Sequence, residues 1–195
     1  MGDPKFTRRG YDTPKHPWEA ARMDEERKLL QKYGLKNKRE LWRAQSVLRG
    51  FRRQARDLQA RLRTGEAQAK READGLLGRL TRLGMLPVGS PTIDDVLALT
   101  TDDLLRRRLE WIVVTRGLSA SPKQARQLIV HGHVALDGQK VTRPGYLVEG
   151  ADEARLGYAP ASGLNDEEHV LRVAIRARLE APPKVEAPPP AESRP

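Results

Sequence analysis

Cysteine is absent from this sequence of 195 residues, which excludes disulfides and thiolate ligands for zinc. Aromatic residues make up only 5% of the chain and hydrophobic residues 38%, a low share for a single large core. No stretch approaches the roughly 20 apolar residues that are needed to span a bilayer, and the first residues lack the apolar core of a signal peptide. These absences predict a cytoplasmic protein that has no membrane partner.

Sequence patterns of common catalytic sites are also missing. The chain contains no P-loop, no nucleophile elbow and no glycine-rich dinucleotide motif. His131 and His133 lie two residues apart, but no third ligand clusters with them, and zinc needs three or four protein ligands. We therefore predict no catalytic residue, no metal, no cofactor and no small-molecule substrate.

Positive charge is what the sequence has in excess. The formal net charge is +10 and the isoelectric point is about 10.2. The excess lies in the first part of the chain, because residues 1–89 hold 22 Lys/Arg against 11 Asp/Glu and residues 90–195 hold 14 against 15. A polyanion is the expected partner, and the N-terminal half is expected to supply most of the electrostatic attraction.

The first 16 residues are polar and include Gly and Pro, which predicts an extended arm rather than a packed element. An arm of this kind can become ordered on a nucleic acid, with Lys5, Arg8 and Arg9 as its predicted contacts. The alternative is a flexible terminus that has no binding role.

Two helices are expected next. The first spans residues 17–33, with Pro17 in its first turn and Gly34 past its end. The second begins at Asn37, and Glu40 three residues later completes a capping pattern. Apolar residues then recur at spacings of three and four up to about Arg63, which predicts an amphipathic helix with the stripe Leu41, Ala44, Leu48, Phe51, Ala55, Leu58 and Leu62.

Basic side chains crowd this second helix, and only Glu40 and Asp57 oppose them. So many like charges repel one another, so phosphate is the natural counter-charge, although a solvated charged face is the alternative. The predicted contacts here are Lys36, Lys38, Arg39, Arg43, Arg49, Arg52, Arg53 and Arg56.

A third helix is predicted over residues 66–83, where Gly75 and Gly78 allow close packing or a bend. Two short helices follow. Thr92 and Thr100 are expected to cap them, each with an Asp three residues later. These short helices lead into residues 106–148.

Residues 106–148 predict two short helical segments followed by a β-ribbon. Ser121 is an N-cap candidate, Pro122 occupies the first helical position, and Gln124 completes a capping box. Gly132 closes this helix, whose apolar face is Ala125, Leu128 and Ile129. Residues 134–136 and 139–141 then form a hairpin around the Asp137–Gly138 turn, and a further turn leads into a strand at 146–148.

The polar sides of these elements are rich in groups that can bind phosphate, donate hydrogen bonds or stack on bases. The alternative is a small α+β unit whose basic surface is solvated and binds no partner. The predicted contacts are Arg107, Arg108, Ser121, Lys123, Gln124, Arg126, Gln127, His131, His133, Lys140, Arg143 and Tyr146.

The string SPKQARQLIVHGHVALDGQKVTRPGYLV resembles the S-four RNA-binding domain nearly throughout. The shared pattern is A-R-Q-L-I, then G-H-V, a turn glycine, a valine, and a proline before the last strand. The resemblance implies a module that binds structured RNA by its shape, through its helix pair and the adjoining ribbon.

A second resemblance covers the preceding helices. The string YGLKNKRELWRAQSVLRGFRRQAR is similar to the N-terminal domain of small-subunit ribosomal proteins of the S-four family, in their archaeal and eukaryotic form. This family implies direct binding to small-subunit ribosomal RNA early in assembly, nucleation of the subunit body, and an influence on decoding accuracy together with the fifth and twelfth small-subunit proteins. No metal is carried over, because the cysteine cluster of some bacterial relatives is absent.

The resulting prediction is an α+β fold in which a mostly helical domain carries an inserted S-four module, so that segments before and after the module pack together. The predicted divisions are an arm at 1–16, a helical domain at 17–105, the module at 106–165, a helix or extension at 166–180, and a disordered Pro-rich tail at 181–195. Asn165 and Glu168 are the expected cap of the last helix. Two alternatives stay open: an RNA-modifying or tRNA-handling enzyme that uses the module for docking, and a factor that binds stalled large subunits.

Overall fold

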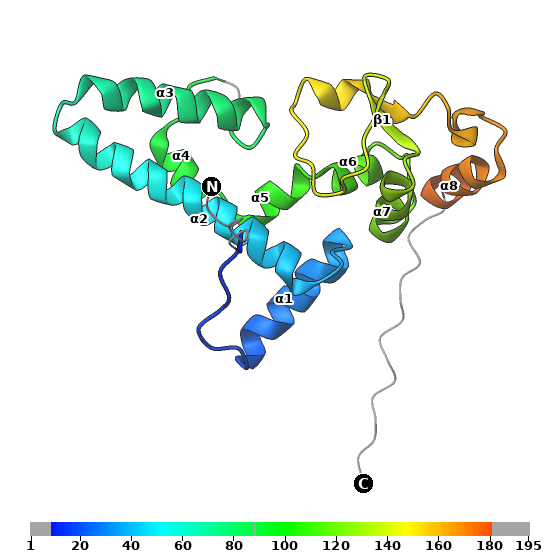
Figure 1. Cartoon of the computed structure of the whole chain (residues 1–195), viewed down its shortest axis with the longest axis horizontal. Coiled ribbons are helices and arrows are strands. Elements are labelled where there is room, and N and C mark those ends of the chain that lie inside the picture. Colours follow the sequence, from blue (N-terminus) through cyan, green and yellow to red (C-terminus); the bar gives the residue numbers. More distant parts are fainter. Residues whose placement is uncertain (1–8, 88, 181–195) are drawn as a thin grey trace, which may run out of the picture.

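The computed structural model describes residues 9–87 and 89–180. Helices predominate and one small antiparallel sheet accompanies them, which confirms the α+β prediction (Figure 1). In chain order the elements are α1 Ala20–Tyr33, α2 Lys38–Arg63, α3 Ala67–Arg82, α4 Ile93–Ala98, α5 Thr101–Arg106, α6 Leu109–Thr115, α7 Pro122–Val130, β1 Val134–Leu136, β2 Gln139–Lys140, η1 Asp152–Arg155, β3 Leu156–Tyr158, η2 Gly163–Asn165 and α8 Val170–Glu180.

Helix α2 organises the first hydrophobic core. Its predicted apolar stripe is buried from Leu41 to Leu58, whereas Leu62 is only partly buried near the helix end. Helices α3, α4 and α5 pack against it, and Figure 1 shows α3 running back alongside α2. The side chains of this core lie between Tyr33 and Leu105. A Cβ added at Gly75 or Gly78 would meet no atom within 4 Å, so these glycines do not mark a close approach of another segment.

Helix boundaries in the first core follow the capping residues with one difference. The expected Asp partners of Thr92 and Thr100 accept hydrogen bonds from the threonine backbones, as predicted. The first helix, however, begins at Ala20 rather than at Pro17, which lies in a turn. It ends as predicted at Gly34, whose φ of 66° is a left-handed conformation that glycine adopts without steric cost.

The described part of the N-terminal arm, residues 9–16, forms no helix or strand, but it contacts α2. Tyr11 lies against Trp42 of α2, with ring centroids 6.2 Å apart. The backbone N–H of Asp12 donates to Ser46 Oγ, and its carboxylate lies 2.7 Å from Arg49 Nη1. These contacts attach the arm to α2 before any nucleic acid is bound. The predicted contacts Lys5 and Arg8 lie outside the described residues.

Helices α6 and α7 and the sheet enclose a second hydrophobic core, which lies between Leu109 and Leu164. Ser121 caps α7 as predicted, because its Oγ accepts a hydrogen bond from the Gln124 N–H. The capping box itself is modified, since the Gln124 Oε1 accepts from the N–H of Ala120 instead of that of Ser121. Ala125, Leu128 and Ile129 are buried, which confirms the predicted apolar face.

The sheet has the strand order β2-β1-β3, with both pairs antiparallel. The β1–β2 hairpin pairs Leu136 with Gln139 across the predicted two-residue turn. The third strand is not the predicted segment 146–148, in which Leu147 forms only an isolated bridge with Arg108. It is instead β3, within a segment for which the sequence indicated no strand. The three residues of β3 include Gly157 and give too short an alternation to stand out in the sequence.

Helix α8 begins at Val170, so the predicted cap at Asn165 is wrong, and Asn165 ends the 3₁₀ turn η2. The helix packs against the module and not against the helical domain: the Arg172 guanidinium lies 5.4 Å from the centroid of the Tyr158 ring, and Leu179 approaches Gly117. Figure 1 shows α8 near α7, at the end of the molecule away from α3. The expected return of the chain to the helical domain is therefore not found up to residue 180, and the predicted tail lies outside the described residues.

The hairpin turn supplies a first testable prediction. Asp137 and Gly138 have φ values of 50° and 76°, as a two-residue type I′ turn requires. Gly138→Val is expected to destabilise the protein by about 1–2 kcal/mol, because a β-branched residue is strained at this φ although the surrounding space is open. Urea unfolding followed by circular dichroism measures the change. Gln139→Val, which adds the same side chain at the next exposed position, is the matched control, and an equal loss in both variants would contradict this explanation.

Candidate nucleic-acid interface

A cleft of about 790 Å³ lies between the two cores. One wall comes from α2 and the end of α3, and the other comes from the segment 142–149 that follows the hairpin. Leu104 and Arg108 also line it, from the point where the chain passes from one core to the other. We call this the interdomain cleft and define it by its charged and aromatic lining residues: Glu40, Arg43, Arg79, Arg82, Arg108, Arg143, Tyr146 and Glu149.

Positive charge dominates the interdomain cleft, because five arginines face two glutamates. Four of these arginines are exposed, one or two from each of α2, α3 and the 142–149 segment, and only Arg108 is buried. Tyr146 is 41% exposed beside them and offers a ring face. Guanidinium groups converging from three segments around an aromatic ring suit the phosphates and unstacked bases of a folded polynucleotide.

Sequence reasoning identified Arg43, Arg108, Arg143 and Tyr146 but missed Arg79 and Arg82. These two arginines lie three residues apart on α3, so they project from one side of that helix. A sequence signal for them was available. Both arginines flank Leu80, which ends the apolar face of α3, and they are three residues apart, as neighbours on one side of a helix are.

The predicted basic contacts from Lys36 to Arg56, on α2 and just before it, divide into two groups. Three of them have protein partners: Lys38 pairs with Glu26, Arg49 with Asp12, and Arg52 donates to the Leu99 carbonyl. The others are exposed and form no ion pair with another residue that the structure describes, namely Lys36, Arg39, Arg43, Arg53 and Arg56. A smaller hollow of about 420 Å³ beside α2 is lined by Arg49, Arg52 and Arg56.

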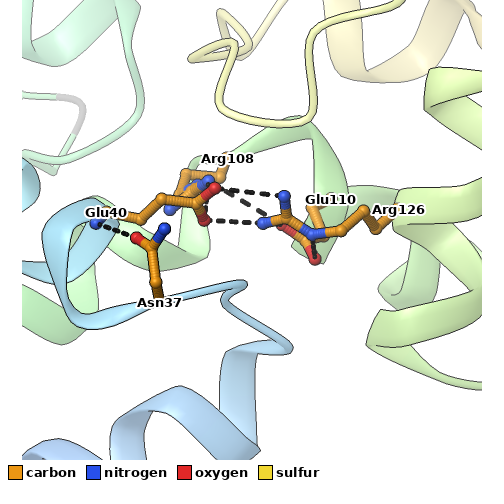
Figure 2. Close-up of polar contacts among 5 residues, drawn as sticks. All are labelled: Asn37, Glu40, Arg108, Glu110 and Arg126. Atoms are coloured by element: carbon orange, nitrogen blue, oxygen red, sulfur yellow. Dashed lines mark hydrogen bonds and ion pairs between the residues drawn. The ribbon is translucent and has the colours of Figure 1, made fainter.

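Arg126 does not occupy the solvent-facing position that the sequence predicted. Its guanidinium lies between two carboxylates, with Nη1 and Nη2 donating to Glu40 at 3.1 and 2.6 Å and Nε and Nη2 donating to Glu110 at 3.1 and 3.0 Å (Figure 2). Arg108 Nη2 joins the same group at 3.2 Å from Glu40 Oε2. We call these four residues the ion cluster. Two positive and two negative side chains make it neutral when all four are ionised.

Burial shapes the protonation of the two carboxylates differently. Glu110 is 1% exposed, and this burial raises its pKa to about 7 with a further contribution from Glu40, although Arg126 and Arg108 oppose the rise. Burial acts on Glu40 in the same direction, but hydrogen bonds and positive charge from Arg126 and Arg108 outweigh it and hold the pKa of Glu40 below its usual value. Glu40 is therefore the carboxylate that stays ionised at neutral pH.

Other residues of the module that were predicted to contact RNA also bind groups of the protein itself. Ser121 and Gln124 cap α7, Arg107 binds Glu153 and the Val148 carbonyl, and His133 Nδ1 lies 2.8 Å from Ser162 Oγ. Those left exposed on the module are Lys123, Gln127, His131, Lys140, Arg143 and Tyr146. Arg9, the described member of the arm's predicted contacts, is also exposed.

Two other classes of site are absent from residues 9–87 and 89–180. No group of three or more His, Cys, Asp or Glu side chains is arranged there to hold a metal ion. None of the helices in these ranges is both long and apolar enough to cross a membrane.

The chain is similar to known proteins. Residues 107–153 match the S4 domain, the S-four module predicted from the sequence, so the chain is an S4-domain protein. Over 177 residues it is 49% identical to the small ribosomal subunit protein uS4 of Thermoplasma acidophilum, which covers 91% of this chain and 88% of that protein. The uS4 proteins of Picrophilus torridus and Methanothermobacter thermautotrophicus are 49% and 46% identical and cover 92% and 86% of this chain, and 98% and 95% of their own lengths.

The chain therefore belongs to the family of small ribosomal subunit protein uS4. The organisms of these relatives are archaea, which agrees with the archaeal and eukaryotic form that the N-terminal signature predicted.

Proposed function

We propose that this protein is a structural constituent of the small ribosomal subunit and binds the small-subunit ribosomal RNA directly. The observation that carries the proposal is the interdomain cleft, in which exposed arginines from both walls face one space. Membership of the uS4 family supports the identity of the RNA. The α2 arginines that form no ion pair among the described residues extend the same positive surface beyond the cleft.

Binding of this kind needs no chemical step. Arginine and lysine side chains neutralise closely spaced phosphates and release counterions, and a rigid pair of domains holds the bound RNA helices at one mutual angle. Neither a catalytic residue nor a cofactor takes part in this mechanism, and the protein is not expected to turn over a substrate.

The residues proposed to contact the RNA are the predicted positions that are exposed and form no ion pair with another described residue, together with Arg79 and Arg82 of α3. They are Arg9, Lys36, Arg39, Arg43, Arg53, Arg56, Arg79, Arg82, Lys123, Gln127, His131, Lys140, Arg143 and Tyr146. The predicted contacts with protein partners, among them Arg107, Arg108, Ser121 and Gln124, are proposed to support this surface from within.

The wider role follows from the resemblance to the family. The protein would bind early, nucleate the body of the small subunit in cytoplasmic ribosomes, and act with the fifth and twelfth small-subunit proteins on decoding accuracy. Family membership supports the ribosomal context of this role.

Sedimentation of the tagged protein through sucrose gradients of cell extract tests the ribosomal assignment. The protein is expected in the small-subunit fraction at moderate salt, and part of it should remain there at high salt because a direct RNA binder does not depend on peripheral proteins. Recovery in the large-subunit fraction would instead favour a factor for stalled large subunits. Recovery away from both subunits, with turnover on RNA, would favour an RNA-modifying or tRNA-handling enzyme.

A further inference from the structure

The segment 33–40, which joins α1 to α2, is attached to the module by three contacts of different kinds. The Tyr33 ring lies 4.7 Å from the Trp111 ring of α6, measured between centroids. Gly34 touches the start of α7 so closely that an added Cβ would stand 2.5 Å from Pro122 Cβ. The third contact is the pairing of Glu40 with Arg126 in the ion cluster (Figure 2). We call these three contacts the joint.

Within the joint, the Glu40–Arg126 pair is the contact with the most exacting geometry. Both edges of the Arg126 guanidinium are occupied, and four of its five donors bind two carboxylates in a fixed plane. Glu40 stands at the start of α2, where the Asn37 side chain caps the helix, and Arg126 stands on α7. The pair therefore connects a helix of the first core directly to a helix of the second.

The ion cluster also borders the proposed RNA site. Glu40 and Arg108 line the interdomain cleft, whereas Arg126 does not. Because the walls of the cleft belong to different cores, their separation depends on the contacts that connect those cores. A cleft whose walls are held in place binds RNA without an entropic cost of ordering them.

We propose that Glu40 and Arg126 are positioning residues that fix the separation of the cleft walls for RNA without contacting the RNA themselves. The proposal rests on the RNA-binding function proposed above. It assigns a purpose to part of the YGLKNKRE signature, whose Tyr33, Gly34 and Glu40 all belong to the joint. On this proposal Glu40 promotes the binding of RNA through the position of the walls, although its negative charge lies in a positively charged cleft.

The sign of one substitution separates this proposal from simple electrostatics. Glu40→Gln removes a negative charge from the cleft, so electrostatic attraction alone would make RNA bind more tightly. A positioning role predicts weaker binding instead, by about tenfold, because two domains that are less firmly coupled must be ordered on the RNA. Glu149→Gln is the matched control: Glu149 lines the same cleft but forms no ion pair within the described residues, so its loss is expected to leave affinity unchanged or increased.

The arrangement of the domains is measured without RNA. Because the sequence contains no cysteine, spin labels are placed only where cysteine is introduced, at Ala60 of α2 and Gln139 of β2, which are both exposed. Double electron–electron resonance on the full chain is expected to give one narrow distance distribution for the unsubstituted joint and for Glu149→Gln, and a broader one for Glu40→Gln and Arg126→Gln. Thermal melts followed by circular dichroism establish that each variant is folded.

The outcomes distinguish the two proposals. A labelled parent protein that fails to bind small-subunit RNA would contradict the proposed function, while the distance distributions would still report on the joint. Glu40→Gln that binds RNA as tightly as the parent, or keeps a narrow distribution, would overturn the positioning role. Unfolding of both Glu40→Gln and Arg126→Gln would also overturn it, because the pair would then be required for folding instead of for the placement of the walls.

Discussion

Replacement of Arg39, Arg43, Arg53 and Arg56 together by glutamine is expected to lower affinity for a small-subunit RNA fragment by about a hundredfold near physiological salt. All four are exposed on α2 and form no ion pair among the residues that the structure describes. If each neutralises one phosphate, the slope of log affinity against log salt should become shallower by about three, since each contact contributes roughly 0.7 to 0.9. Filter binding between 50 and 300 mM salt measures both quantities.

A comparison of two double variants controls for the loss of net charge. Arg53→Gln with Arg56→Gln removes two positive charges from α2, and Arg176→Gln with Arg178→Gln removes the same number from α8, where both residues are also exposed. Only the α2 pair is expected to weaken binding substantially. Equal losses in the two variants would mean that overall charge, and not the α2 surface, provides the attraction.

Truncation of the α2 core is expected to have the largest effect on stability. Leu48→Ala and Phe51→Ala should each lower the free energy of unfolding by about 2–5 kcal/mol, because they lose buried contacts and leave cavities between α2 and its neighbours. Phe51→Ala also removes the ring beneath Arg79, whose guanidinium lies 5.8 Å from the ring centroid. Urea unfolding monitored by circular dichroism measures the losses.

Val47→Ala serves as the control for these truncations. Val47 precedes Leu48 on α2 but is 39% exposed, so its substitution is expected to change stability by less than about 0.5 kcal/mol. A loss as large as that of Leu48→Ala would show that the apolar stripe does not mark the buried face of α2.

The parts of the fold that local patterns control were predictable from the sequence. The stripe on α2 predicted its buried face because side chains three and four residues apart share one side of a helix. Asn37, Ser121, Gly34 and Gly138 act within a few residues of themselves, so their caps and turns follow from residue type. The start of α1 was not predictable in this way, because Glu19 provides no side-chain cap and Pro17 falls in a turn.

Long-range pairing limited the prediction of the site. Arg126 and Glu40 are 86 residues apart, so nothing local showed that this arginine would be enclosed by carboxylates instead of facing RNA. Glu40 illustrates the same limit, since its spacing from Asn37 fits a capping box but its carboxylate binds Arg126 and Arg108. A sequence can indicate that a surface is basic, but the choice between phosphate and protein as the partner of each arginine depends on the packing of distant elements.

Binding to RNA that carries no other protein tests the central proposal most directly. The measurement is the affinity of the purified chain for small-subunit ribosomal RNA free of proteins, at moderate salt and with large-subunit RNA as competitor. A direct binder that uses the interdomain cleft is expected to form a one-to-one complex that the competitor does not displace, and the four-arginine variant should lose it. Equal binding to both RNAs, or binding only after other ribosomal proteins have been added, would contradict the proposal.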